Sequence, residues 1–175
     1  MTSPGHDTVN PRDIRFTFGH SSLGLTLTTS SSRGICSIAL GDDLETLLRE
    51  LRERLPHTYL IEDNNKQIAA AVAKLVDTPW RDFSLPLDMR GTDFQQRVWQ
   101  TLQTIPSGAT LSYAEIAARI GQPTAARAVG SACAANLLAV AIPCHRATRA
   151  DGSLSGYRWG VDRKRALLKK ETART

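Results

Sequence analysis

Two side chains able to do nucleophilic chemistry stand next to each other in the run Ile142-Pro143-Cys144-His145-Arg146. A cysteine attacks as the thiolate, so its pKa of about 8.5 must be lowered by a nearby base or cation. Neighbours in an extended chain point to opposite faces, so contact between Cys144 and His145 needs a bend or an intervening water. The pair predicts a reactive thiol, although by itself it leaves open a buried cysteine beside a half-exposed histidine.

The surroundings of the pair favour chemistry. Asn136 precedes it, and a glycine-containing run from Asp151 to Tyr157 follows. A histidine that acts as a base needs an acceptor on its second ring nitrogen, and a carboxylate from the last helix could supply it. We therefore expect a tight pocket around Cys144.

The composition is that of an ordinary soluble protein, with 41% hydrophobic and 22% charged residues in a chain of 175. It contains no apolar run of the roughly 20 residues that span a bilayer, and no signal-peptide core. We expect a cytoplasmic monomer with no membrane contact. Cys36, Cys133 and Cys144 lack Cys-x-x-Cys spacing and the four histidines are scattered, which argues against a disulfide scaffold and a metal site.

Charge is divided unevenly along the chain. Residues 1–90 carry 10 Lys/Arg against 12 Asp/Glu, whereas residues 91–175 carry 12 against 5. The basic half is also the half with the cysteine. This asymmetry favours a polyanion partner for residues 91–175, with a solvated basic surface as the alternative.

Hydrophobic patterning predicts two domains after a flexible N-terminus at residues 1–12. Residues 13–90 form an α/β domain, in which a small antiparallel sheet is packed with helices. Its expected strands are 14–18, 23–29 and 35–40, and its expected helices are 44–55 and 65–76. Residues 85–88 read as an edge strand or an extended linker. Asp42 is the expected N-cap of the first helix.

Residues 91–175 form a mainly α domain. Capping boxes at Thr92–Gln95 and Ser112–Glu115 begin two helices. With Gly121 as a C-terminal residue and Pro123 opening the next helix, residues 112–134 read as a helix-turn-helix. A last helix over 162–171 should turn its basic residues to solvent. These are Arg163, Lys164, Arg165, Lys169 and Lys170.

The second helix of the pair consists of small residues around one long cation, Arg127. Small side chains allow a helix to approach another surface closely, and tight packing against the rest of the protein would explain them equally. A lone arginine on such a face favours entry into a DNA groove. In that interpretation Arg127 probes the base stack.

Taken together, these motifs resemble the O6-alkylguanine-DNA alkyltransferases, above all those that form the C-terminal half of a bacterial adaptive-response protein. The zinc-binding phosphotriester-repair half of that protein has no counterpart here. Besides Pro143-Cys144-His145-Arg146, seven segments carry the resemblance: Arg33-Gly34-Ile35-Cys36, Leu85-Pro86-Leu87-Asp88, Gly91-Thr92-Asp93-Phe94-Gln95-Gln96, Ser112-Tyr113, Ala128-Val129, Ser131-Ala132-Cys133-Ala134-Ala135-Asn136 and Ser155-Gly156-Tyr157-Arg158-Trp159-Gly160.

The resemblance implies a ribonuclease H-like N-terminal domain and a cofactor-free, single-use transfer of an alkyl group from O6-alkylguanine in double-stranded DNA, and from O4-alkylthymine. It also implies a role for each matching residue. Cys144 would accept the alkyl group, His145 would act as base through a water, Glu171 would hold His145, and Asn136 would brace the turn. Tyr113 would protonate the guanine and help rotate the nucleotide.

For DNA, the resemblance implies contacts from Arg127, Ala126, Ala128, Gly130 and Tyr113. For the guanine pocket, it implies Tyr113, Ala147, Tyr157 and Arg158. Ala147-Thr148 replaces the two valines usual in the family, which makes the pocket wall smaller and more polar.

Two other functions are compatible with parts of the sequence. A non-catalytic module that binds alkyl damage is the first, and the presence of Cys144 argues against it. A cysteine hydrolase is the second, but no oxyanion hole can be identified and the basic helix-turn-helix would have no purpose.

Overall fold

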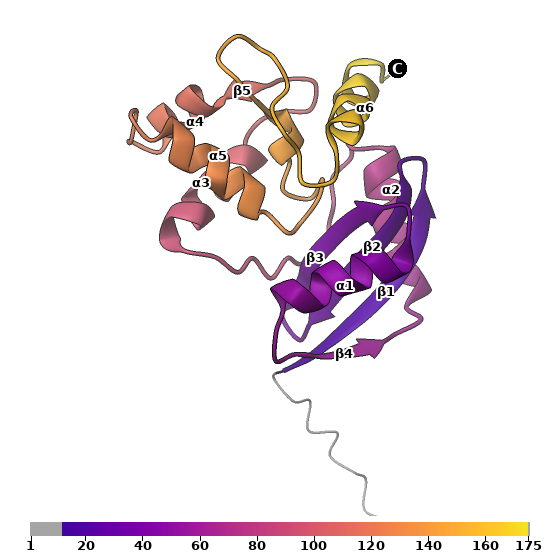
Figure 1. Cartoon of the computed structure of the whole chain (residues 1–175). Coiled ribbons are helices and arrows are strands. Elements are labelled where there is room, and N and C mark those ends of the chain that lie inside the picture. Colours follow the sequence, from indigo (N-terminus) through magenta and orange to yellow (C-terminus); the bar gives the residue numbers. More distant parts are fainter. Residues whose placement is uncertain (1–11, 175) are drawn as a thin grey trace, which may run out of the picture.

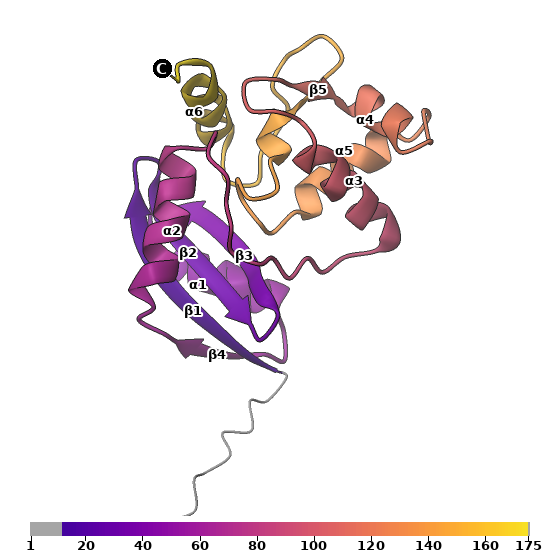
Figure 2. The same cartoon turned by 180° about the vertical axis from the view of Figure 1, so that it is seen from behind.

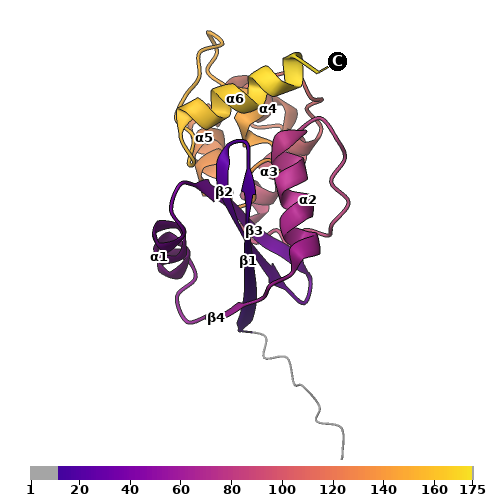
Figure 3. The ribbon, with the colours of Figure 1, turned by 90° about the vertical axis from the view of Figure 1, so that its right-hand side faces the viewer.

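The computed structural model describes residues 12–174, so the predicted flexible segment 1–12 lies outside the described residues except for Arg12. The N-terminal part is a four-stranded sheet in the order β3-β2-β1-β4 with a helix on each face (Figures 1 and 2). Its elements are β1 (Asp13–Ser21), β2 (Gly24–Ser31), β3 (Gly34–Gly41), α1 (Leu44–Arg54), β4 (Tyr59–Glu62) and α2 (Lys66–Asp77). Seen edge-on, α1 and α2 flank the sheet on opposite sides (Figure 3).

The sheet is mixed, which corrects the prediction of an antiparallel one. β1, β2 and β3 are antiparallel neighbours, but β4 pairs with β1 in parallel. Helix α1 carries the chain across one face to the far edge, so β4 runs in the direction of β3 and β1. The strand was missed because only four residues, Tyr59 to Glu62, form it. The N-cap of α1 is Asp43 rather than Asp42.

The C-terminal part is mainly helical. It comprises α3 (Asp93–Gln103), β5 (Leu111–Ser112), α4 (Tyr113–Arg119), α5 (Ala126–Ala135), the 3₁₀ turn η1 (Cys144–Arg146), β6 (Ala147–Thr148) and α6 (Val161–Thr172). Both predicted capping boxes form, at Thr92 and at Ser112. Helix α5 begins at Ala126 rather than near Pro123, because a turn closed by Ala125 N–H and the Gln122 carbonyl (2.9 Å) takes up the intervening residues.

The outer edge of β3 connects the two parts. Ile35 exchanges backbone hydrogen bonds with Pro86 and Asp88, at 2.8 and 2.7 Å. Ile38 does the same with Leu137 and Ala139, at 2.8 and 3.1 Å. The second pairing anchors the loop that leads from α5 to Cys144. One hydrophobic core includes side chains of β3 and α2 together with side chains of α3, α4, α5 and α6.

Within residues 12–174, no helix is long and apolar enough to cross a bilayer. In the same range, no three His, Cys, Asp or Glu side chains are grouped as they would be around a metal ion.

Candidate active site

Asn136 shapes the loop that presents Cys144. Its buried side-chain amide donates to the Ile142 carbonyl (3.0 Å), and its Oδ1 accepts from the Leu138 N–H (2.9 Å). Within this loop Val140 has a φ of 67°. A β-branched residue in the left-handed region is strained, and the Asn136 bonds help to hold it there. The chain then bends into η1, so the pair at 144–145 is not extended.

The thiol of Cys144 is buried and hydrogen-bonded. Asn136 Nδ2 donates to Sγ at 3.2 Å, and the residue is 5% exposed. Burial raises the pKa of Cys144 to about 11, although the Asn136 hydrogen bond and the charge of Lys164 act to lower it. The resting pocket therefore holds a protonated thiol, in contrast to the lowered pKa expected from the sequence, because the pocket withholds water from the thiolate. Attack requires removal of the proton.

His145 is oriented by Glu171, as expected for a base. Its Nε2 lies 2.8 Å from Glu171 Oε1, and both side chains are fully buried. Burial lowers the pKa of His145 and outweighs the opposite effect of the Glu171 carboxylate, so the ring is neutral at pH 7. Donation from Nε2–H to Glu171 leaves the lone pair on Nδ1. Nδ1 is buried and has no hydrogen-bond partner among the described residues.

Arg146 binds Glu171 as well. Its Nη2 lies 2.7 Å from Glu171 Oε1, and it donates to the carbonyls of Ile105 (2.7 Å) and Pro79 (3.2 Å). Burial acts to raise the pKa of Glu171, but the hydrogen bonds from His145 and Arg146 outweigh it and leave that pKa below its usual value. Sequence reasoning assigned Arg146 no partner and missed this contact.

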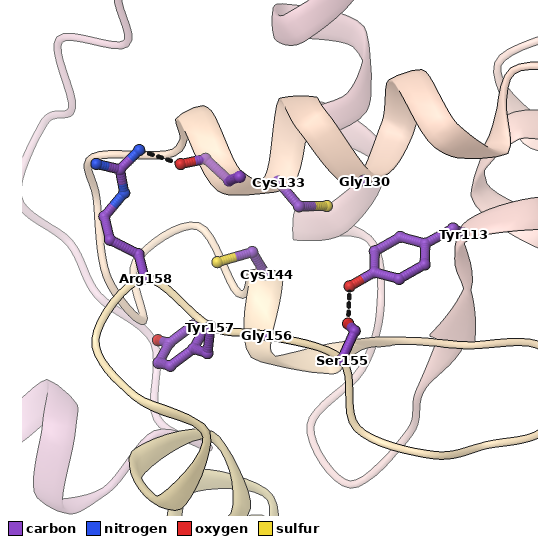
Figure 4. A pocket seen from close by; sticks show the side chains of 9 residues that line it. Tyr113, Gly130, Cys133, Cys144, Ser155, Gly156, Tyr157 and Arg158 are labelled. Atoms are coloured by element: carbon purple, nitrogen blue, oxygen red, sulfur yellow. Dashed lines mark hydrogen bonds between the residues drawn. The ribbon is translucent and has the colours of Figure 1, made fainter.

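A cavity of about 410 Å³ opens beside the thiol. Cys144 lies between Arg158 on one side and Tyr113 with Ser155 on the other (Figure 4). The lining residues are Tyr113, Gly130, Cys133, Ala134, Cys144, Ser155, Gly156, Tyr157 and Arg158. Of the residues predicted to line it, Tyr113, Tyr157 and Arg158 do so. Ala147 does not, because it is fully buried in β6, where it pairs with Leu111 of β5.

Five of these lining residues were not predicted to line the pocket. They are Gly130, which was expected only to contact DNA, and Cys133, Ala134, Ser155 and Gly156. Cys133 and Ala134 are among the small residues of α5, and their spacing from Gly130 by three and four places them on one helical face, a signal that could have found them. No such signal exists for Ser155, which lies in an irregular loop.

The exposed face of α5 leads to the mouth of this cavity. Arg127 and Ala128 are exposed, whereas Ala126 and Gly130 are half-buried. A Cβ added to Gly130 would meet no atom within 4 Å. The Arg127 carbonyl accepts a hydrogen bond from the Ser131 hydroxyl (3.3 Å), but the Arg127 guanidinium makes no hydrogen bond or ion pair with any residue from 12 to 174. The helix thus offers a low surface of small residues with one unengaged cation beside the pocket.

Comparison with known proteins shows similarity along most of the chain. Residues 93–173 match the family model described as 6-O-methylguanine DNA methyltransferase, DNA binding domain. The chain is 49% identical over 164 residues to the bifunctional transcriptional activator/DNA repair enzyme Ada of Escherichia coli, covering 90% of this chain and 45% of Ada. It therefore spans about half the length of the first relatives that it matches.

Other relatives are matched over nearly their full length. The methylated-DNA–protein-cysteine methyltransferase of Mycolicibacterium paratuberculosis is 43% identical over 145 residues, covering 81% of this chain and 88% of that protein. The crystal structure of Mycobacterium tuberculosis OGT in complex with DNA is similar with a TM-score of 0.74 and 35% identity, covering 92% of this chain and 93% of that one. This chain belongs to the family of methylated-DNA–protein-cysteine methyltransferases.

Proposed function

We propose that this chain repairs O6-alkylguanine in double-stranded DNA, and also O4-alkylthymine, by moving the alkyl group to Cys144. The observation that carries the proposal is the buried thiol, with a neutral and oriented histidine next to it in sequence, in a pocket that opens beside α5. The DNA complex of the Mycobacterium tuberculosis relative supports DNA as the partner.

The transfer follows from these groups. His145 Nδ1 takes the Cys144 proton through a water, and the thiolate attacks the alkyl carbon. The S–C bond forms while the C–O6 bond breaks, and its electron pair stays on the guanine, which takes a proton from Tyr113. The thioether has no route back to the thiol, so each protein molecule acts once and needs no cofactor.

The pocket must receive the base from outside the duplex. A stacked base hides its O6 substituent, and flipping it out costs a few kcal/mol. In the proposal Arg127 fills the gap in the stack, while Ala126, Ala128 and Gly130 let α5 approach the groove. Tyr113 helps to rotate the nucleotide, and Tyr157 and Arg158 line the pocket for the guanine.

The proposal extends to the organisation of the chain. Residues 91–175 act as the alkyltransferase domain with a DNA-binding helix-turn-helix formed by α4 and α5. Residues 13–90 act as a ribonuclease H-like support. We propose that the protein works as a cytoplasmic monomer without a metal.

Mass spectrometry after incubation with duplex DNA containing O6-methylguanine tests the function. We expect one added methyl group, located on Cys144, and a yield that stops at one methyl per protein. Cys144→Ala should accept none, whereas Cys36→Ala, which alters a buried thiol in β3, should behave as the unmodified protein. Continued turnover would contradict the mechanism, and tight binding of damaged DNA without transfer would favour the non-catalytic module.

A further inference from the structure

Arg158 brings a guanidinium into the wall of the cavity that holds Cys144. Its Nη2 donates to the Ala134 carbonyl at the C-terminal end of α5 (Figure 4), and its Cζ lies 6.0 Å from the centroid of the Trp159 ring. A helix C-terminus and an aromatic face both favour a cation, so these contacts hold the guanidinium in place. Neither of them supplies a full negative charge to balance it.

The rest of the Arg158 guanidinium has no partner in the protein. Its Nε and Nη1 atoms are buried and make no hydrogen bond within residues 12–174. No carboxylate of that range forms an ion pair with Arg158, and none of the residues that line the cavity is acidic. Burying unpaired donors of a charged group is costly, so the arrangement fits a partner that arrives with the substrate.

A second cation adds to the positive charge around the thiol. Lys164 of α6, which the sequence predicted to face solvent, is 1% exposed. It lies close enough to act on the pKa of Cys144, which burial raises and the Lys164 charge lowers. The buried carboxylate of Glu171 is already balanced by Arg146. The cavity therefore favours a group that carries negative charge.

The place of Arg158 indicates which part of the substrate would carry that charge. Cys144 lies between Arg158 and the pair formed by Tyr113 and Ser155 (Figure 4). Tyr113 is the proposed proton donor to the guanine, so the base occupies the Tyr113 side and the transferred group extends past the thiol toward Arg158. A DNA phosphate is the other anion available, but the sugar–phosphate backbone stays at the mouth of the cavity, whereas Nε and Nη1 are buried.

We propose that Arg158 is a specificity-determining residue that pairs with a carboxylate on the transferred group, so that the chain accepts O6-carboxymethylguanine and favours it over a neutral lesion of the same shape. The inference rests on the proposed alkyl transfer and names a class of alkyl group for it. The Cys144 thiolate attacks the methylene carbon of the O6–CH2–COO⁻ group. The S–C bond forms while the C–O6 bond breaks, and its electron pair stays on the guanine, which takes a proton from Tyr113. The carboxylate keeps its charge and accepts from an unpaired N–H group of Arg158.

Two alkylating agents of nearly equal shape test the pocket without DNA. Iodoacetate and iodoacetamide both alkylate a thiolate and release iodide, but only iodoacetate is charged. We expect the ratio of their rates at Cys144, followed by mass spectrometry, to exceed the ratio for free cysteine at least about tenfold, which corresponds to about 1.4 kcal/mol. The protonation of the thiol affects both reagents alike and cancels in the ratio. A ratio no higher than that of free cysteine would refute the inference without any variant.

Variants assign the preference to Arg158. Arg158→Met removes the charge and keeps an unbranched side chain, and it should lower the iodoacetate-to-iodoacetamide ratio about tenfold. Arg158→Lys keeps the charge but not the planar guanidinium, so it should retain part of the preference. Arg165→Met removes an exposed charge of α6 that pairs with Asp162, and it should leave the ratio unchanged. Equal ratios in Arg158→Met and the unmodified protein would contradict the assignment.

Duplex DNA tests the same preference on the lesion itself. O6-carbamoylmethylguanine carries a neutral amide in place of the carboxylate of O6-carboxymethylguanine. In single-turnover reactions, Arg158→Met should lower the ratio of the carboxymethyl rate to the carbamoylmethyl rate at least about tenfold. If Arg158→Met slowed transfer from these two lesions and from O6-methylguanine equally, the guanidinium would serve the DNA phosphates or α5 instead, and the inference would be refuted.

The outcomes separate the inference from the function beneath it. If Cys144 took a methyl group from O6-methylguanine DNA but Arg158→Met changed neither ratio, the inference alone would fail. If Cys144 preferred iodoacetate but took no alkyl group from any of the three DNAs, the proposed function would fail and the lesion preference with it.

Discussion

Glu171 is the residue on which most of the site's electrostatics depends. It accepts from His145 and Arg146, and more distantly from the Gly108 N–H at 3.3 Å. The two basic side chains of this cluster differ, since Arg146 is charged and His145 is held neutral by burial. The Glu171 carboxylate therefore fixes the orientation of His145, and Arg146 supplies the positive charge that balances the carboxylate.

We predict that acid destabilises the protein through His145 and Glu171. Both have pKa values below the ordinary ones in the folded state, so the unfolded chain binds more protons. The free energy of unfolding should fall as pH drops below the ordinary histidine value of 6.5, and fall further from about 4.5 as pH approaches the lowered pKa of Glu171. Urea denaturation at a series of pH values measures this.

His145→Gln should flatten the upper part of that pH dependence, and His20→Gln, at an exposed position in β1, should not. An unchanged slope in His145→Gln would show that the acid sensitivity comes from other groups.

Helix α5 is the element that joins surface and pocket. One end carries Arg127 on an exposed face, and the other end contributes Cys133 and Ala134 to the cavity. The helix has no side-chain cap at its N-terminus and is held instead by packing of Val129, Ala132 and Cys133. Its small residues therefore serve both close packing inside and close approach outside.

We predict that Arg127→Ala impairs repair of duplex DNA selectively. Flipping a base out of the duplex costs a few kcal/mol, and Arg127 offsets part of this cost by filling the gap in the stack. If the loss of the arginine raises the cost by about 1.4 kcal/mol, the rate falls tenfold. Single-turnover rates on duplex DNA should fall at least about tenfold, while rates on the free O6-methylguanine base should not. An equal loss on the free base would refute the intercalating role.

Substitutions of Gly130 should affect the stability of the protein and the approach of DNA in different ways. A glycine inside a helix costs about 0.5–1 kcal/mol relative to alanine, and space is open around it. Gly130→Ala should therefore raise the free energy of unfolding by about that amount, as measured by urea denaturation. Gly130→Leu should also fold but should slow transfer from DNA, because its side chain would project at the mouth of the cavity. Full activity in Gly130→Leu would contradict a close approach at this position.

One hydrophobic core contains residues from both sides of the predicted domain boundary at Gly91. Ile35 and Ile38 of β3 belong to the same core as Leu167 of α6. Arg163 of α6 adds polar contacts, donating to the Leu23 carbonyl (2.8 Å) and pairing with Asp42 (2.7 Å). The sheet thereby supports both the loop before Cys144 and the helix that carries Glu171.

We expect the two halves to unfold as one unit. Tryptophan fluorescence, which reports on Trp80, Trp99 and Trp159, should give the same urea midpoint as far-UV circular dichroism, which reports on all helices and strands. Ile38→Ala, at the junction, should lower both midpoints together, with a loss of about 2–5 kcal/mol. Two separate transitions would instead support independent domains.

By itself the sequence determined the local features: the cysteine–histidine pair, both capping boxes, the turn at Gly121 and most helix and strand positions. These features depend on residues close together in the chain, so they can be predicted from the spacing of residue types over short stretches. It also predicted the contact between His145 and Glu171, through the family resemblance.

Only the tertiary structure decided which charges are buried and what they face. Lys164 is one of five basic residues of α6, yet it alone of these is buried, because it shares the inward face of the helix with Leu167 and Glu171. The contact of Arg146 with Pro79 and the parallel pairing of β4 with β1 likewise join residues far apart in sequence. Such contacts cannot be predicted from the spacing of residues along the chain, because they form only when separate helices and strands pack together.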